Sequence, residues 1–197
     1  NFPIQNTSFV GREKEIKTIT GLINKHRIVS LVGTGGCGKT RLACQAVLTL
    51  DNEYTDGIWF INLAPVISEE LVEKELLDGL QIAEIPDKPI MELLIEKIRD
   101  KKLLLLLDNC EHVLTTCAEL TSKLVQSVPG LSILTTSRKA LNIKGEKVWR
   151  ISPLSLVDPS SSTGPECASQ SEAVRLFADR ALSNNPEIGR ASCRERV

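Results

Sequence analysis

The stretch RIVSLVGTGGCGKT, residues 27–40, decides the fold of this chain. Its first half is a short apolar run rich in β-branched residues, which is typical of a buried strand, and its second half is rich in glycine. All fixed positions of the pattern G-x-x-x-x-G-K-[ST] are present between Gly33 and Thr40. A helix is expected from about Lys39 to Leu50, so the pattern stands between a strand and a helix, as in loops that wrap phosphate groups.

Each residue type in this loop has a chemical reason to be there. The glycines allow positive φ angles, which turn backbone N–H groups towards phosphate oxygens, and the N-terminus of the following helix favours the same anion. The Lys39 ammonium is expected to reach the β- and γ-phosphates, and the Thr40 hydroxyl to ligate Mg²⁺. A glycine-rich turn without a ligand is the alternative. The candidate nucleotide-binding residues of the loop are Gly33, Thr34, Gly35, Gly36, Cys37, Gly38, Lys39, Thr40 and Arg41.

A second informative stretch is LLLLLDNCEHV, residues 103–113. Its leucines predict a fully buried strand, and ligands of open α/β sheets sit beyond the carboxyl ends of such strands. Asp108 is therefore expected to hold the Mg²⁺ that accompanies a nucleotide, with a solvated loop carboxylate as the alternative. Arg138 follows the strand LSILTTS, residues 131–137, where its charge would meet a γ-phosphate, although a surface arginine is also possible.

The rest of the chain continues this alternation of strands and helices. Strands are predicted over 27–33, 57–63, 102–108, 131–137 and 147–152. Helices are predicted over 12–25, 39–50, 90–100 and 171–182. A further helix is predicted to begin after Ser68, its N-cap, and another to run from Val113 to near Pro129. This order predicts an α/β fold with a parallel sheet between two layers of helices.

The domain boundaries follow from changes in composition. Residues 1–156 are expected to form the nucleotide-binding domain, and 157–170, rich in Pro, Ser and Gly, a linker. Residues 171–186 would open a new unit, with Ser169 and Glu172 in a capping-box pattern. Residues 187–197 can be encoded by a string that resembles a sequencing adapter read in frame, so they are interpreted as a library artefact. A basic tail is the alternative.

Composition excludes some classes of protein. The net charge of −1 and 4% aromatic residues argue against a general nucleic-acid surface. No apolar run reaches the roughly 18 residues that cross a membrane. The six cysteines contain no C-x-x-C pair and, with two histidines, no zinc spacing. Reduced thiols in a cytoplasmic protein are therefore expected, with a disulfide framework as the alternative.

Together these motifs resemble the STAND class of P-loop ATPases, the NB-ARC and NACHT relatives. The nearest likeness is to the ATPase module of large bacterial LuxR-type and antibiotic-regulator-type transcription regulators. The resemblance covers about 7–182 and includes SFVGREKEI, residues 8–16, where the family's equivalents of Val10 and Arg12 lie against adenine. It also includes VGTGGCGKTRLA, LLLLLDNCEHV, ILTTSRKAL, GEKVWRISPLS and EAVRLFADRA.

The resemblance implies a five-stranded sheet of order 5-1-4-3-2, with residues 171–186 as the first helix of a truncated helical lid. It implies ADP bound at rest and ATP in an active, self-associating state. A DNA-binding effector domain would lie outside this chain. One position departs from plant and animal NB-ARC proteins, which carry a second Asp where this chain has Asn109.

The catalytic candidates are Glu111, Asn109 and Arg138. Glu111 stands at the spacing where bacterial and NACHT relatives place an acid, and it is favoured over Asn109 for orienting the attacking water. It could instead cap a helix or face solvent. A slow Mg²⁺-dependent ATPase switch is the leading interpretation, and a P-loop kinase acting on a small molecule, or another turnover NTPase, is the rival. A scaffold that binds no nucleotide is disfavoured by Lys39, Thr40 and Asp108.

Overall fold

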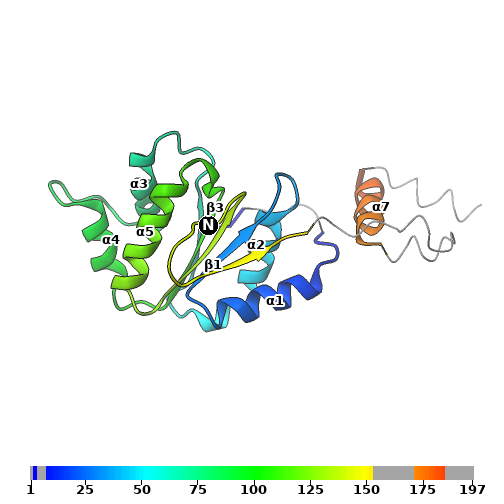
Figure 1. Cartoon of the computed structure of the whole chain (residues 1–197), viewed down its shortest axis with the longest axis horizontal. Coiled ribbons are helices and arrows are strands. Elements are labelled where there is room, and N and C mark those ends of the chain that lie inside the picture. The colour runs from blue at the N-terminus through cyan, green and yellow to red at the C-terminus, as the bar shows by residue number, and fades with distance from the viewer. Residues whose placement is uncertain (1, 4–7, 153–170, 185–197) are drawn as a thin grey trace, which may run out of the picture. The chain divides into compact units, whose positions relative to one another are not determined.

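A computed structural model describes residues 2–3, 8–152 and 171–184. The chain divides into two compact units, one of 1–3 with 14–152 and one of 4–13 with 153–197. The larger unit holds the sheet (Figure 1). The predicted linker, Ser169 of the predicted capping box and the predicted adapter-derived segment lie outside the described residues.

Five parallel strands form the sheet of the larger unit. They are β1 (Ile28–Val32), β2 (Ile58–Asn62), β3 (Leu103–Asp108), β4 (Leu131–Ser137) and β5 (Glu146–Arg150). Their spatial order is β2-β3-β4-β1-β5, and every neighbouring pair is parallel. This is the predicted order 5-1-4-3-2 counted from the other edge, so the predicted sheet is confirmed. It places β1 next to β4, with β3 on the far side of β4.

Helices cover both faces of the sheet, which confirms the three-layer prediction (Figure 1). The helices of the larger unit are α1 (Glu13–Ile23), α2 (Lys39–Leu48), α3 (Val72–Gly79), α4 (Ile90–Ile98) and α5 (Leu114–Ser127). Helices α3, α4 and α5 pack against one face, and α1 and α2 lie on the other. Helix α7 (Glu172–Asn184) belongs to the smaller unit, at the place where a helix was predicted.

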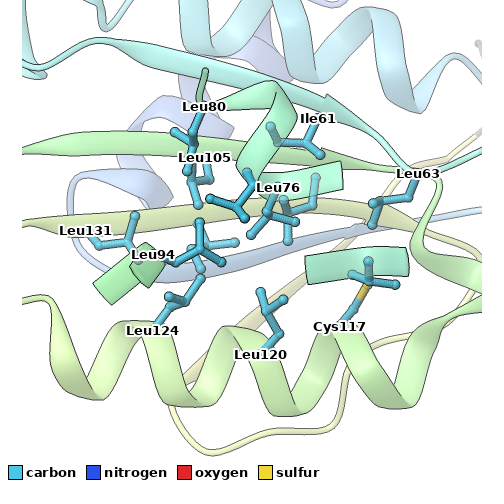
Figure 2. Close-up of a cluster of buried hydrophobic side chains, with 14 of the residues drawn as sticks. Ile61, Leu63, Leu76, Leu80, Leu94, Leu105, Cys117, Leu120, Leu124 and Leu131 are labelled. Atoms are coloured by element: carbon cyan, nitrogen blue, oxygen red, sulfur yellow. The ribbon is translucent and has the colours of Figure 1, made fainter. Parts of the chain in front are cut away.

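Strand β3 is apolar as far as Leu107, as expected of a strand in a sheet that helices cover on both faces. All six of its residues are buried. Leu103, Leu105 and Leu107 join the core cluster formed with α3, α4 and α5, to which Leu76 and Leu94 also belong (Figure 2). A strand covered on both faces has no polar side to show, so it does not alternate. The first polar residue of β3 is Asp108, at its carboxyl end.

The observed bounds differ from the predicted ones by one or two residues in most elements. The larger difference concerns Ser68, which was predicted to cap a helix with its side chain. Ser68 instead precedes a short 3-10 turn, Glu69–Leu71, its side chain makes no capping hydrogen bond, and α3 begins only at Val72. The Ser68 carbonyl accepts the Leu71 N–H at 3.2 Å, so the backbone closes this turn. In the part of the chain that the structure describes, every helix is too short or too polar to cross a membrane.

Candidate functional site

The glycine-rich loop joins β1 to α2 at the carboxyl edge of the sheet. The Gly33 N–H donates to the Ser137 carbonyl at 3.2 Å, which ties the start of the loop to the end of β4. Gly36 and Gly38 have φ angles of +75° and +86°, values that other residues adopt only with strain. A Cβ atom at Gly33 would lie 2.9 Å from the Cys37 sulfur, so position 33 needs glycine for space. The loop thus has the backbone shape that the glycine pattern predicts.

Lys39 is the first residue of α2, and its ammonium points back into the loop. Its Nζ donates to the carbonyls of Gly33 and Thr34, each at 3.0 Å. The residue is buried, with 7% of its surface exposed. These loop carbonyls are the ammonium's hydrogen-bond acceptors, and the positive charge lies where the loop would hold phosphate oxygens.

Thr40, in the first turn of α2, contacts Asp108 at the carboxyl end of β3. The Thr40 hydroxyl donates towards both carboxylate oxygens of Asp108, at 2.8 Å to Oδ1 and 3.0 Å to Oδ2. Asp108 is 2% exposed. A hydroxyl and a carboxylate side by side are oxygen ligands of the kind that Mg²⁺ prefers, together with phosphate oxygens. The two predicted metal ligands therefore lie in one place.

Thr136 of β4 also contacts Asp108, a contact that was not predicted from the sequence. Its hydroxyl donates to Oδ1 of Asp108 at 2.5 Å and accepts the backbone N–H of Asn109 at 3.1 Å. Thr136 is completely buried. The available signal was a pair of neighbouring threonines near the carboxyl end of a mostly buried strand.

Glu111 and Arg138, two of the predicted catalytic residues, form an ion pair. Arg138 Nε lies 3.3 Å from Oε1 of Glu111, with the side chains 66% and 24% exposed. A Cβ atom at Gly35 would lie 3.8 Å from an Arg138 guanidinium nitrogen, so this group lies beside the phosphate loop. Glu111 sits in a 3-10 turn, Cys110–His112. Because only 24% of its side chain is exposed, Glu111 faces solvent only in part, which was the alternative predicted for it.

Asn109, the third catalytic candidate, is oriented towards the Asp108 carboxylate. Its Nδ2 donates to Oδ2 of Asp108 at 3.0 Å. Its φ of +61° is in the left-handed region, which asparagine tolerates better than most residues. This backbone geometry turns the chain after β3, and the side chain supports Asp108.

The remaining predicted binding residues are more dispersed. Arg41 of α2 and Cys37 of the loop are half-buried. Val10 and Arg12 belong to the smaller unit, where Val10 is half-buried and Arg12 is 5% exposed with a φ of +64°. Their predicted place against an adenine ring stays a prediction.

Within the smaller unit, the segment that carries Val10 and Arg12 is bonded to α7. The Ser8 hydroxyl donates to Asp179 at 2.5 Å, and Arg180 donates to the Ser8 carbonyl at 2.9 Å. The opening motif of the chain and its last described helix are thus joined.

Two buried cysteines near the site, Cys44 and Cys110, are held as neutral thiols. Burial, followed by the nearby charge of Asp108, raises the pKa of Cys44 to about 12. A hydrogen bond with the Cys117 thiol, followed by burial, raises the pKa of Cys110 well above its usual value. Cys37, Cys44, Cys110 and Cys117 are free thiols. A thiol with a raised pKa is a poor nucleophile, so Cys44 and Cys110 are suited to packing.

The parallel sheet, the glycine loop around Lys39 and the Thr40–Asp108 contact together define a P-loop nucleotide-binding fold. Residues 12–151 match the NB-ARC domain. The chain belongs to this family, whose members are P-loop ATPases of the STAND class, and the predicted resemblance is confirmed.

The relatives are bacterial and most are much longer. The chain is 38% identical over 175 residues to "Uncharacterized protein Rv0894" of Mycobacterium tuberculosis. This match covers 89% of this chain and 41% of that protein. The chain is also 38% identical over 165 residues to "Putative HTH-type transcriptional regulator Rv0890c" of the same organism, with coverage of 84% and 17%. The chain thus spans less than half the length of either relative.

Solved structures show the same fold at low sequence identity. A STAND protein with a tetratricopeptide repeat sensor from Pyrococcus horikoshii matches with a TM-score of 0.52 at 18% identity, over 84% of this chain and 25% of that one. Cdc6p from Pyrobaculum aerophilum matches with a TM-score of 0.57 at 19% identity, over 75% of this chain and 48% of that one.

Proposed function

We propose that this chain is the nucleotide switch of a larger regulatory protein. It binds ADP or ATP with Mg²⁺, hydrolyses ATP slowly, and controls a DNA-binding effector domain outside this sequence. The observation that carries the proposal is the loop with the Lys39 ammonium inside it and the Thr40–Asp108 pair at its side. The relative named as an HTH-type regulator supports the choice of effector. Membership of the NB-ARC family favours this switch over a small-molecule kinase.

The residues present fit a magnesium nucleotide. The loop N–H groups and the Lys39 ammonium supply donors for phosphate oxygens, and the Thr40 hydroxyl and Asp108 carboxylate supply oxygen ligands. When bound, Mg²⁺ would neutralise phosphate charge and help to orient the triphosphate. Lys39 would then exchange its loop carbonyls for phosphate oxygens. Val10 and Arg12 are the proposed adenine contacts.

Arg138 and Glu111 are proposed to read the γ-phosphate. The Arg138 guanidinium lies beside Gly35 of the loop and is bound to Glu111. A γ-phosphate would compete with Glu111 for this cation, and ADP would not. Among the described residues, Oε2 of Glu111 is buried and accepts no hydrogen bond. Once Arg138 has turned from Glu111 to the γ-phosphate, the released Glu111 carboxylate would accept a proton of the attacking water, while Asn109 holds the Asp108 carboxylate.

Calorimetric titration with Mg²⁺-ADP and Mg²⁺-ATP tests the proposal. The intact protein should bind both nucleotides. Lys39→Ala should weaken binding by about 10- to 100-fold, because a charge-assisted hydrogen bond contributes about 1.5–3 kcal/mol. The matched control is Lys123→Ala, which removes an exposed lysine from α5 and should leave the affinity unchanged. Equal affinities for wild type and Lys39→Ala would refute the assignment.

Light scattering of the full-length protein tests the switch itself. We expect self-association with Mg²⁺-ATP and a monomer with Mg²⁺-ADP. The same oligomeric state with either nucleotide would leave a nucleotide-binding domain without switch behaviour, and the proposal would fail.

A further inference from the structure

We propose that Thr136 is a positioning residue that links the strand of Arg138 to the metal carboxylate through a single hydroxyl group. The proposal rests on the proposed function, because it concerns how Asp108 is prepared for Mg²⁺. Thr136 lies on β4, two residues before Arg138, and neither the glycine loop nor the Asp108 motif contains it.

The hydroxyl of Thr136 is used in both directions. It donates to Oδ1 of Asp108 at 2.5 Å and accepts the Asn109 N–H at 3.1 Å. Thr136 is completely buried and Asp108 is 2% exposed, so water has little access to replace these bonds. A buried hydroxyl with one donated and one accepted bond has a fixed orientation, and so does the carboxylate oxygen that it binds.

The donated bond sets the direction of the carboxylate. With Oδ1 held by Thr136 and Oδ2 held by the Asn109 side chain, the Asp108 carboxylate cannot rotate freely about its last bond. The Thr40 hydroxyl reaches both oxygens of the carboxylate held in this way. Groups that orient a metal ligand in this way affect metal affinity without touching the metal.

The accepted bond sets the turn that follows β3. Asn109 has a φ of +61°, and its N–H is held by Thr136. The next turn carries Glu111, which pairs with Arg138 at 3.3 Å. The contacts therefore close a ring, from Thr136 through Asn109 and Glu111 to Arg138 and back along β4. A single hydroxyl thus connects the metal carboxylate with the pair that would read the γ-phosphate.

Thr135, the preceding residue, offers a matched control. It is equally buried and lies on the same strand, but its hydroxyl meets Ser30 of β1 at 2.8 Å. Thr135→Val removes a buried hydroxyl from β4 without touching Asp108. Any general effect of losing such a group should therefore appear in both variants.

The test is the affinity for ADP measured by calorimetry, once with Mg²⁺ and once with EDTA, on the intact protein. In Thr136→Val, the strengthening of ADP binding by Mg²⁺ should fall by about 10- to 100-fold, the range for changes next to a metal ligand. Its affinity in EDTA should equal that of wild type, because the phosphate loop is untouched. Thr136→Ser retains the hydroxyl and should keep the Mg²⁺ effect. Thr135→Val should keep it as well.

Two results would overturn the proposal. One is a Thr136→Val protein with the wild-type Mg²⁺ effect, and the other is an equal loss in Thr135→Val. If the valine variant does not fold, Thr136→Ala carries the same expectations. If wild type binds no nucleotide, the proposed function itself fails. If wild type binds ADP more tightly with Mg²⁺ and both hydroxyl-free variants do the same, only the role of Thr136 fails.

Discussion

Glu111→Gln should make the protein bind ATP more tightly while it hydrolyses ATP more slowly. In the structure, Glu111 Oε1 holds the Arg138 guanidinium at 3.3 Å, beside the loop at Gly35. A γ-phosphate must take Arg138 from this carboxylate. Glutamine keeps the shape of the side chain but loses its charge, so the competition weakens. The same change removes the carboxylate that would accept a proton from water.

The size of the affinity change follows from the geometry of the pair. At 3.3 Å, two unit charges interact by about 1.3 kcal/mol in bulk water and about 5 kcal/mol at an effective dielectric constant of about 20. Arg138 is 66% exposed, so the screened value applies, and exposed pairs contribute about 0.2–1 kcal/mol. Removing the competitor should therefore raise ATP affinity by about 1.4- to 5-fold. Hydrolysis should slow by about 10²- to 10⁴-fold, the usual contribution of a general base.

Calorimetry with ATP and ADP, and single-turnover hydrolysis, measure these effects in the full-length protein. ADP affinity should not change, because ADP has no group that competes for Arg138. The gain in ATP affinity should shrink at high salt, which screens the ion pair. Arg138→Ala should weaken ATP binding and cancel the gain from Glu111→Gln in the double variant. Weaker ATP binding in Glu111→Gln, or equal effects on ATP and ADP, would refute this reasoning.

Three further predictions concern the loop and the core. Iodoacetamide should label the half-buried Cys37 faster than Cys44, and ADP should slow this labelling; peptide mass mapping that shows one rate with and without ADP would favour an inert filler. Since the pKa of Cys44 is raised to about 12 in the fold, its contribution to stability is complete below about pH 8.5 and is lost as pH rises above that. The free energy of unfolding, measured with urea between pH 8 and about 10.5, should therefore fall more steeply with pH in wild type than in Cys44→Ala. Parallel curves for the two proteins would contradict this. Leu105→Ala should lower the free energy of unfolding by about 2–5 kcal/mol, whereas a loss below about 1 kcal/mol would mean that the core refills the space.

The sequence predicts the sheet and the centre of the site because these depend on periodicity and topology. Once β1 and β3 flank β4 in a parallel sheet, Thr40 and Asp108 must lie at the same edge. The contacts of Thr136 could not be predicted in the same way. They depend on the register of β3 against β4 and on which face each threonine presents, and a shift of one residue would exchange Thr136 with Thr135. The ion pair between Glu111 and Arg138 could not be predicted from the sequence either, because it depends on the left-handed backbone at Asn109.

The run of leucines before Asp108 has a physical purpose in such a site. Asp108 is 2% exposed, and its hydrogen-bond donors, Thr40, Thr136 and Asn109, are neutral. None of the ion pairs between the described residues includes it. Neutral donors reduce the cost of removing a carboxylate from water but leave its negative charge in place. That charge contributes to the raised pKa of Cys44. A fully buried strand fixes the carboxylate in position, and the proposed Mg²⁺ would compensate a charge held in this way without a protein cation.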